Sequence, residues 1–164
     1  MSYAKFGAMI LVSTIAMFGL MYLNTYEMDH VLYSQTRTWM AVVMGATMAI
    51  IMQVFMWDMY ESKRANTGII ASSLVIFAAS LWLVRSQETV DDVSYMKAMI
   101  PHHSIAIMTS ERAHIKDPRV RKMADGIAET QVREIREMKE LIASLQQQPT
   151  PEGAPNIPPK RPPR

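Results

Sequence analysis

The sequence predicts an all-α protein in which three membrane-spanning helices precede an antiparallel pair of water-soluble helices. The first half of the chain holds three long apolar segments separated by short polar loops. The second half spaces apolar residues among charged ones as amphipathic helices do. The last residues are rich in proline and hold almost nothing apolar. These observations divide the chain into a membrane domain (1–85), a helical hairpin (86–147) and a disordered tail (148–164).

Composition limits the chemistry that the 164 residues can support. The net charge is only +2, and basic residues alternate with acidic ones between 119 and 140, so no basic patch for nucleic acid is present. The absence of cysteine excludes disulfides and thiolate metal sites. Imidazole, thioether and carboxylate groups remain as possible metal ligands. The 16 methionines are unusually many, although methionine is also an adaptable packing residue.

The three predicted spans cover about residues 6–23, 39–57 and 68–84. A helix rises about 1.5 Å per residue, so each is close to the length that crosses a hydrocarbon core of about 30 Å. The first also resembles a signal peptide, but no small-x-small cleavage site follows it. Two tryptophans, Trp39 and Trp57, bracket the second span as interfacial residues do.

The positive residues near the spans predict the orientation. Lys5 and the pair Lys63-Arg64 fall on one side, and the positive-inside rule places that side in the cytoplasm, although Arg85 argues weakly for the reverse. An odd number of spans then places everything after Arg85 outside the cytoplasm.

Within the second span a methionine recurs at every fourth residue: Met40, Met44, Met48, Met52 and Met56. Such a row winds slowly round a helix of 3.6 residues per turn. It is either a thioether ladder for a soft cation or a stripe that packs against other helices. We favour packing, since no histidine or acid accompanies the row.

Two amphipathic helices are predicted after the membrane domain. Thr89 with Asp92 gives a start that resembles a capping box, and this helix runs to about His114. Asp117-Pro118 begins the next one, with Asp as N-cap and Pro in the first turn, and it runs to about Leu145.

The candidate site centres on Met99-Ile100-Pro101-His102-His103. Met99 lies three and four residues before the two histidines, the spacings at which side chains on a helix meet. Pro101 is expected to kink the helix just before them. A helical wheel places Tyr95, Met99, His103, Ala106, Ser110 and Ala113 on one face with His102 at its edge, and Lys97, Ser104, Glu111 and Arg112 opposite.

The second helix carries a seven-residue apolar seam that two polar residues, Gln131 and Glu134, interrupt. Polar groups on a buried face are costly unless a partner satisfies them. Antiparallel folding about a turn near residues 115–117 supplies that partner. It places Met99 opposite Glu134, with Tyr95 level with Met138. The same register brings His102 and His103 to Gln131 and Thr130.

The coincidence of these patches favours a metal site over a purely structural polar network. Mixed imidazole and thioether ligands suit copper best, and methionine favours Cu(I). Three other candidates are weaker. The segment Glu27-Met28-Asp29-His30 has Glu-x-x-His spacing, but a solvated loop is the simpler interpretation. His114 is explained as a partner of its helix dipole, and Asp92 as a helix-start residue or an outer-shell group.

The motif Asp92-(x)2-Tyr95-(x)3-Met99-Ile100-Pro101-His102-His103, followed by Gln131-(x)2-Glu134 and Met138, resembles the bacterial "domain of unknown function 305" family. The resemblance covers about residues 91–145. It implies a ferritin-like bundle and copper binding in the periplasm, with Met99, His102, His103, Glu134 and Met138 as ligands. Asp92, Tyr95 and Gln131 would support them.

The chain departs from the family pattern at two points. Met108-Thr109 stands where the family commonly has Asp-Met, so one acid is lost. The family often carries two such hairpins and this chain has one. A lone two-helix hairpin cannot enclose a core, so we expect a second copy or a membrane-complex partner to complete the bundle.

We therefore expect an extracytoplasmic copper-binding protein of a bacterial plasma membrane, serving copper sequestration or delivery. The alternative is a structural accessory subunit of a larger membrane complex. An enzymatic role such as a metal oxidase is less favoured, because the Glu-x-x-His pairs of di-iron sites are missing.

Overall fold

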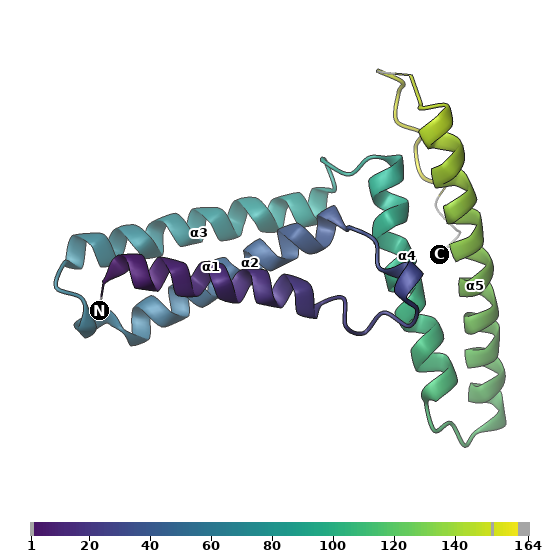
Figure 1. Cartoon of the computed structure of the whole chain (residues 1–164), viewed down its shortest axis with the longest axis horizontal. Helices are drawn as coiled ribbons and strands as arrows, with labels where there is room; N and C mark the ends of the chain where they lie inside the picture. Colours follow the sequence, from purple (N-terminus) through teal and green to yellow (C-terminus); the bar gives the residue numbers. More distant parts are fainter. Residues whose placement is uncertain (1, 152, 161–164) are drawn as a thin grey trace.

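The computed structural model describes residues 2–151 and 153–160, and within them the chain forms helices and no strand. The elements of this described part are α1 (Tyr3–Leu20), η1 (Met28–His30), α2 (Gln35–Phe55), η2 (Trp57–Met59), α3 (Lys63–Ser86), α4 (Asp92–Arg112) and α5 (Pro118–Gln147). Helices α1, α2 and α3 lie along one another, and α4 and α5 stand across one end of this bundle (Figure 1). The all-helical prediction is confirmed.

Helices α1, α2 and α3 are each long and apolar enough to cross a membrane. Their ends differ from the predicted spans because polar caps, rather than hydropathy, set where they begin. The hydroxyl of Ser2 accepts from the N–H of Lys5, which starts α1 at Tyr3. Ser62 caps α3 in the same way through Ala65, so α3 begins within the predicted loop.

Helix α2 packs against both α1 and α3. It approaches α1 closely at Gly45, where an added Cβ would meet the side chain of Thr14. At the end that carries the N-terminus, the Tyr3 hydroxyl donates to Oδ1 of Asn66 over 2.9 Å. The methionine row contributes to this packing, since Met52 and Met56 contact the buried cluster of Phe6, Ala49 and Tyr60.

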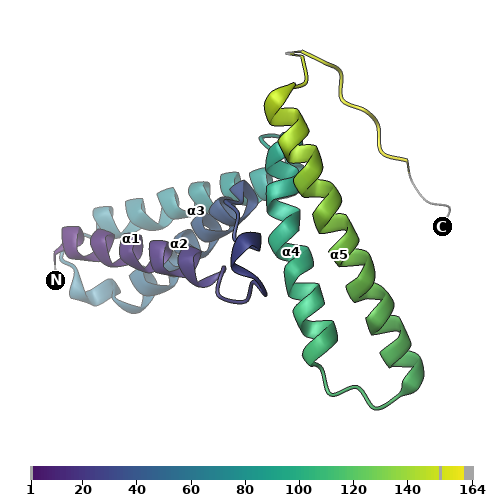
Figure 2. The same cartoon turned by 45° about the vertical axis from the view of Figure 1, so that its right-hand side comes forward.

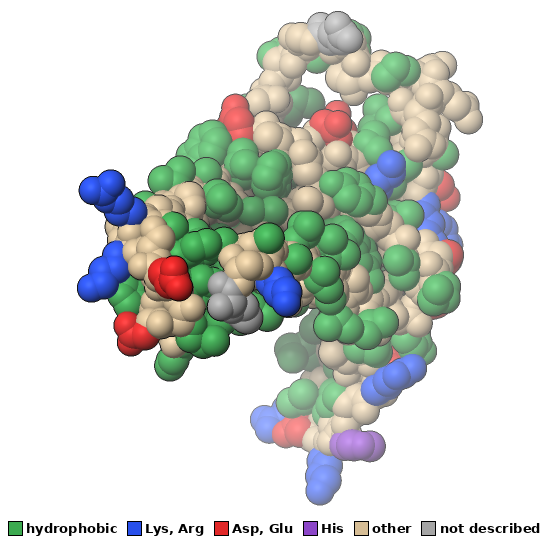
Figure 3. All heavy atoms as spheres, turned by 60° about the vertical axis from the view of Figure 1, so that its left-hand side comes forward, with side chains coloured by type: hydrophobic (Ala, Val, Ile, Leu, Met, Phe, Trp, Pro, Cys, Tyr) green, Lys and Arg blue, Asp and Glu red, His purple; other side chains and the backbone are tan. Residues whose placement is uncertain are grey.

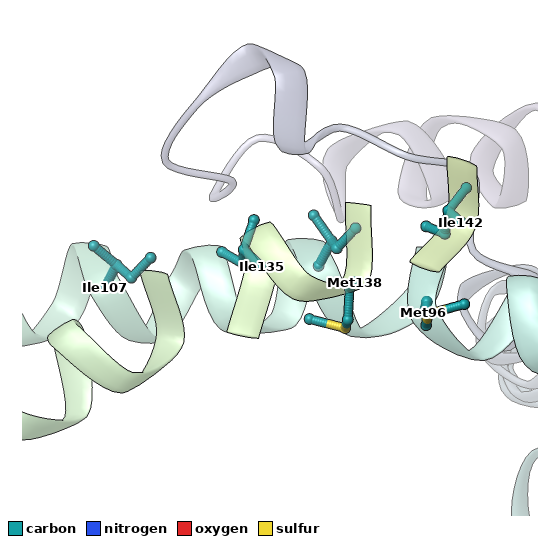
Figure 4. Close-up of a cluster of buried hydrophobic side chains, with 6 residues drawn as sticks. Met96, Ile107, Ile135, Met138 and Ile142 are labelled. Atoms are coloured by element: carbon teal, nitrogen blue, oxygen red, sulfur yellow. The ribbon is translucent and has the colours of Figure 1, made fainter. Parts of the chain in front are cut away.

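Helices α4 and α5 run antiparallel and share a hydrophobic core (Figure 2). The side chains of Met96 and Ile142 face each other across the pair, and Ile107 and Ile135 lie further along it (Figure 4). The predicted start of α5 is observed, with Asp117 accepting from the N–H of Arg119. The predicted start of α4 is corrected, because Asp91 caps it by accepting from Ser94.

The loop between α1 and α2 packs onto the other side of α4. The backbone N–H of Tyr26 donates to Oγ of Ser104 over 2.9 Å, and Nδ1 of His30 lies 3.0 Å from the same oxygen. Lys139 of α5 donates to Oδ2 of Asp29 over 2.6 Å. Ser104 is fully buried as a result. It lies on the side of α4 opposite Met99 and His103, as predicted, and the α1–α2 loop covers this side.

The predicted disordered tail adopts no helix or strand in its described residues, 148–151 and 153–160. Its remaining residues, Glu152 and 161–164, lie outside the described part. Near the start of this segment, the hydroxyl of Thr150 donates to Oδ2 of Asp92 over 3.3 Å.

Candidate metal site in the groove between α4 and α5

A groove of about 640 Å³ runs between α4 and α5, and we call it the α4–α5 groove. Its lining includes six of the eight residues singled out from the sequence: Asp92, Tyr95, Met99, His103, Glu134 and Met138. Leu141, Ser144 and Leu145 are among the residues that complete the wall. The groove therefore gathers an imidazole, three thioethers (Met96, Met99 and Met138) and carboxylates from both helices.

His103 and Glu134 are the polar pair of the groove. Nδ1 of His103 lies 3.3 Å from Oε2 of Glu134, and the His103 side chain is only 12% exposed. The alignment is too poor for a hydrogen bond, so this buried nitrogen has no hydrogen-bond partner in the described part of the chain. Buried nitrogens without hydrogen-bond partners are uncommon, and a bound ion or water molecule is one explanation for them.

Gln131 supports the pair from α5. Its amide donates to Oε2 of Glu134 over 3.4 Å, a long hydrogen bond between neighbouring turns of the same helix. Gln131 does not line the groove. The supporting role that the family resemblance implies for Gln131 stays a prediction.

Burial lowers the pKa of His103 below its usual value of about 6.5. The carboxylate of Glu134 acts in the opposite direction, and the nearby His102 imidazole adds to the lowering. The folded protein therefore favours the neutral ring, whose lone pair can bind a metal ion. By linkage, the contribution of His103 to the free energy of unfolding is fully present above about pH 6.5. It is lost as the pH falls from there through the lower pKa of the folded state.

Met99 and Met138, the two candidate thioether ligands of the groove, differ in access to solvent. Met99 is half-buried beside the hydrophobic core, whereas Met138 belongs to that core and is 9% exposed. The thioether of Met99 is therefore the more accessible of the two.

His102 does not share the groove with His103. It is exposed and lines a separate cavity of about 430 Å³, to which Met21 contributes from just after α1, and Arg37 and Met40 from α2. The centres of the two imidazole rings lie 6.2 Å apart and the rings are tilted by 56°. Met99 lines both cavities.

The register of the two helices is about one turn away from the predicted one. His103 lies opposite Glu134, where the sequence predicted Met99. The register was predicted from a turn near residues 115–117, together with the apolar seam of the second helix. The contact between α4 and the α1–α2 loop also sets how α4 is turned, and the seam carries no information about it.

Sequence reasoning missed the burial of His30. The side chain is 7% exposed because it inserts between the loop and α4, so the predicted solvated loop is wrong for this residue. The only signal in the sequence was the Glu-x-x-His spacing of the segment. Met108 stands at the position of the family's acid, and Thr109, at the position of the family's methionine, donates its hydroxyl to the carbonyl of Ala106.

Comparison with known proteins assigns the family. Residues 92–161 match the family described as Domain of unknown function (DUF305). The chain is also 30% identical to the Uncharacterized protein L153 of Acanthamoeba polyphaga mimivirus, over 82% of this chain and 91% of that protein. The chain belongs to the DUF305 family. The DUF305 match begins with the first residue of α4, so every candidate residue of the groove falls within it. No solved structure matches the chain.

We predict that Glu134→Gln lowers the pKa of His103 further. The negative carboxylate of Glu134 stabilises the protonated ring in the wild type, and the neutral amide does not. An NMR titration of the imidazole C–H signals of the full-length protein measures this pKa. The matched control is Glu129→Gln on the exposed side of α5, which should leave it unchanged. An unchanged or higher pKa in Glu134→Gln would contradict the assigned contact.

Proposed function

We propose that the chain is a membrane-anchored protein that binds copper in the α4–α5 groove, for sequestration or delivery. The observation that carries the proposal is the meeting of Met99, His103 and Glu134 in one groove, with the imidazole and the carboxylate 3.3 Å apart. The helices bring together residues 35 positions apart in the chain. A purely structural polar contact would not require a thioether beside it.

The chemistry of these groups suits copper better than other metals. Imidazole binds copper in both oxidation states, and thioether sulfur selects Cu(I). The lowered pKa of His103 keeps the ring available as a ligand below the pH at which a free histidine is half protonated. Zinc and iron would gain little from the thioether of Met99 that lines the groove with His103, because they prefer imidazole and carboxylate ligands.

Three features support membrane anchoring and the orientation in which α4 and α5 are extracytoplasmic. Helices α1, α2 and α3 have the length and hydropathy of membrane spans. Charged side chains gather at the bundle end that carries the N-terminus, with a largely hydrophobic surface beside them (Figure 3). That end holds exposed Lys5, Lys63 and Arg64, and α4 and α5 lie at the other end (Figure 1). Placement in a bacterial plasma membrane rests on the family resemblance.

We predict that a membrane-impermeant maleimide labels Glu129→Cys in intact cells but labels Glu61→Cys only after the membrane is broken. Glu129 is exposed on α5, Glu61 is exposed in the α2–α3 loop, and the chain has no cysteine of its own. Labelling of Glu61→Cys in intact cells, with Glu129→Cys protected, would reverse the proposed orientation.

A second copy of the chain, or a membrane-complex partner, completes the bundle in this proposal. An apolar row on α5 stays exposed beside the groove: Val120 (44% exposed), Met123 (61%), Ile127 (40%) and Leu141 (47%). Leu141 also lines the groove, so a chain packed on this row would cover the metal site. In the alternative function, an accessory subunit, the row would contact another protein of the complex.

A short bis-maleimide should crosslink Ile127→Cys into a dimer in native membranes, because the two apolar rows would face each other. Arg133→Cys, on the charged side of α5, is the control that should stay monomeric. A single larger adduct with a different protein would favour the accessory subunit. Isolated monomers for both variants would contradict the completed bundle.

We predict that the full-length protein binds Cu(I), and that His103→Ala and Met99→Leu each weaken binding by about tenfold or more. A competition titration with a chromophoric Cu(I) chelator measures the affinity. His114→Ala is the control, because His114 is exposed and distant from the groove lining. Equal affinity of the wild type and His103→Ala would falsify the proposed site.

A further inference from the structure

A second group of metal-ligating side chains lies outside the groove, in the loop between α1 and α2. Glu27, Asp29 and His30 place one ligand atom each within 4.8 Å of one another, and we call them the loop cluster. Nε2 of His30 is 3.7 Å from Oε2 of Glu27 and 3.8 Å from Oδ1 of Asp29. Both carboxylates therefore flank the same ring nitrogen.

The ring of His30 is fixed in this orientation. Its side chain is 93% buried, and Nδ1 lies 3.0 Å from the hydroxyl oxygen of Ser104, which is itself fully buried. Histidine ligands in proteins are commonly held through the ring nitrogen that does not bind the metal. The other nitrogen, Nε2, is too far from either carboxylate for a hydrogen bond.

The loop cluster opens onto space that can hold an ion. Glu27 and His30 line a cavity of about 270 Å³ between the loop, α4 and α5, which is room for several water molecules. Tyr26, Ile107, Glu111, Val132, Ile135, Arg136 and Lys139 form the remaining wall. The side chains of Glu27 and Asp29 are 58% and 64% exposed, so an ion can reach them from solvent.

The charged groups around the loop cluster leave its ligand atoms free. Lys139 donates to Oδ2 of Asp29 and leaves Oδ1 directed at His30. The same hydrogen bond lowers the pKa of Asp29, so the carboxylate is ionised at neutral pH. Glu111 accepts a hydrogen bond of 2.7 Å from the hydroxyl of Tyr26, so its carboxylate is engaged by Tyr26 and not by His30.

We propose that Glu27, Asp29 and His30 form a second metal site, for a borderline divalent cation of the Zn²⁺ class. Two carboxylate oxygens and one imidazole nitrogen are ligands that Zn²⁺ accepts, with water completing the coordination. No thioether takes part, so the loop cluster differs in chemistry from the α4–α5 groove. An ion held here would tie the α1–α2 loop to α4 through His30 and to α5 through Asp29.

The proposal does not depend on copper binding in the groove. The competing explanation is a structural clamp in which the Ser104 hydroxyl donates to Nδ1 and the N–H of Nε2 faces the acids without any ion. The two explanations differ in whether the protein binds Zn²⁺ through Glu27 and Asp29. These two side chains are exposed, so their amide variants should fold even if His30→Ala does not.

The test is calorimetric titration of the full-length protein in detergent with Zn²⁺ alone at neutral pH. We expect one saturable site of this kind, weakened about tenfold or more by Glu27→Gln or Asp29→Asn and abolished in the double variant. His103→Ala and the cavity-wall control Glu111→Gln should retain it. Zinc binding that is unchanged in His103→Ala would show that this site is separate from the α4–α5 groove.

Two results would overturn the proposal. Zinc binding by the Glu27→Gln/Asp29→Asn variant that equals wild-type binding would place the ion elsewhere. No saturable binding by the wild type would leave the loop cluster as a structural clamp. Neither result bears on copper binding by Met99 and His103.

Discussion

The hydroxyl of Ser104 is the point on which the arrangement of α4 depends. It is fully buried, accepts the backbone N–H of Tyr26 and lies 3.0 Å from Nδ1 of His30. Leaving a buried polar group without its partner costs about 1–3 kcal/mol, so this contact fixes how α4 is turned against the loop. With the Ser104 side of α4 covered by the loop, Met99 and His103 are directed to the α4–α5 groove.

This constraint explains which parts of the fold were predictable from sequence. The three apolar helices follow from hydropathy, and the start of α5 follows from Asp117-Pro118, because these signals are local. The rotation of α4 depends on a contact between residues 78 positions apart in the chain. No periodicity within α4 encodes that contact, so the helical wheel placed Ser104 opposite His103 but did not show that the loop buries it.

The site was predictable to a similar degree. The spacing of Met99 and His103, together with Glu134 across the pair, identified residues that the groove does bring together. Adjacent positions on a helix point about 100° apart, so His102 and His103 were always difficult to place in one site. The structure separates them into two cavities. His30 was judged by its short polar segment, which gave no sign that it inserts against α4.

Helix α4 thereby presents different chemistry on two sides. Towards α5 it offers imidazole and thioether groups in a groove with an apolar wall, which suits a soft ion. Towards the loop it holds the Ser104 hydroxyl against His30, next to two carboxylates, which suits a harder ion. Ions bound on both sides would stabilise the same helix, because each would link α4 to a different neighbour.

X-ray absorption spectroscopy of the full-length protein, loaded with one equivalent of Cu(I), tests the central claim most directly. The α4–α5 groove predicts sulfur and imidazole nitrogen together in the first coordination shell, with the imidazole contribution lost in His103→Ala. A shell that contains only sulfur, or an imidazole contribution that persists in His103→Ala, would contradict copper binding at this site.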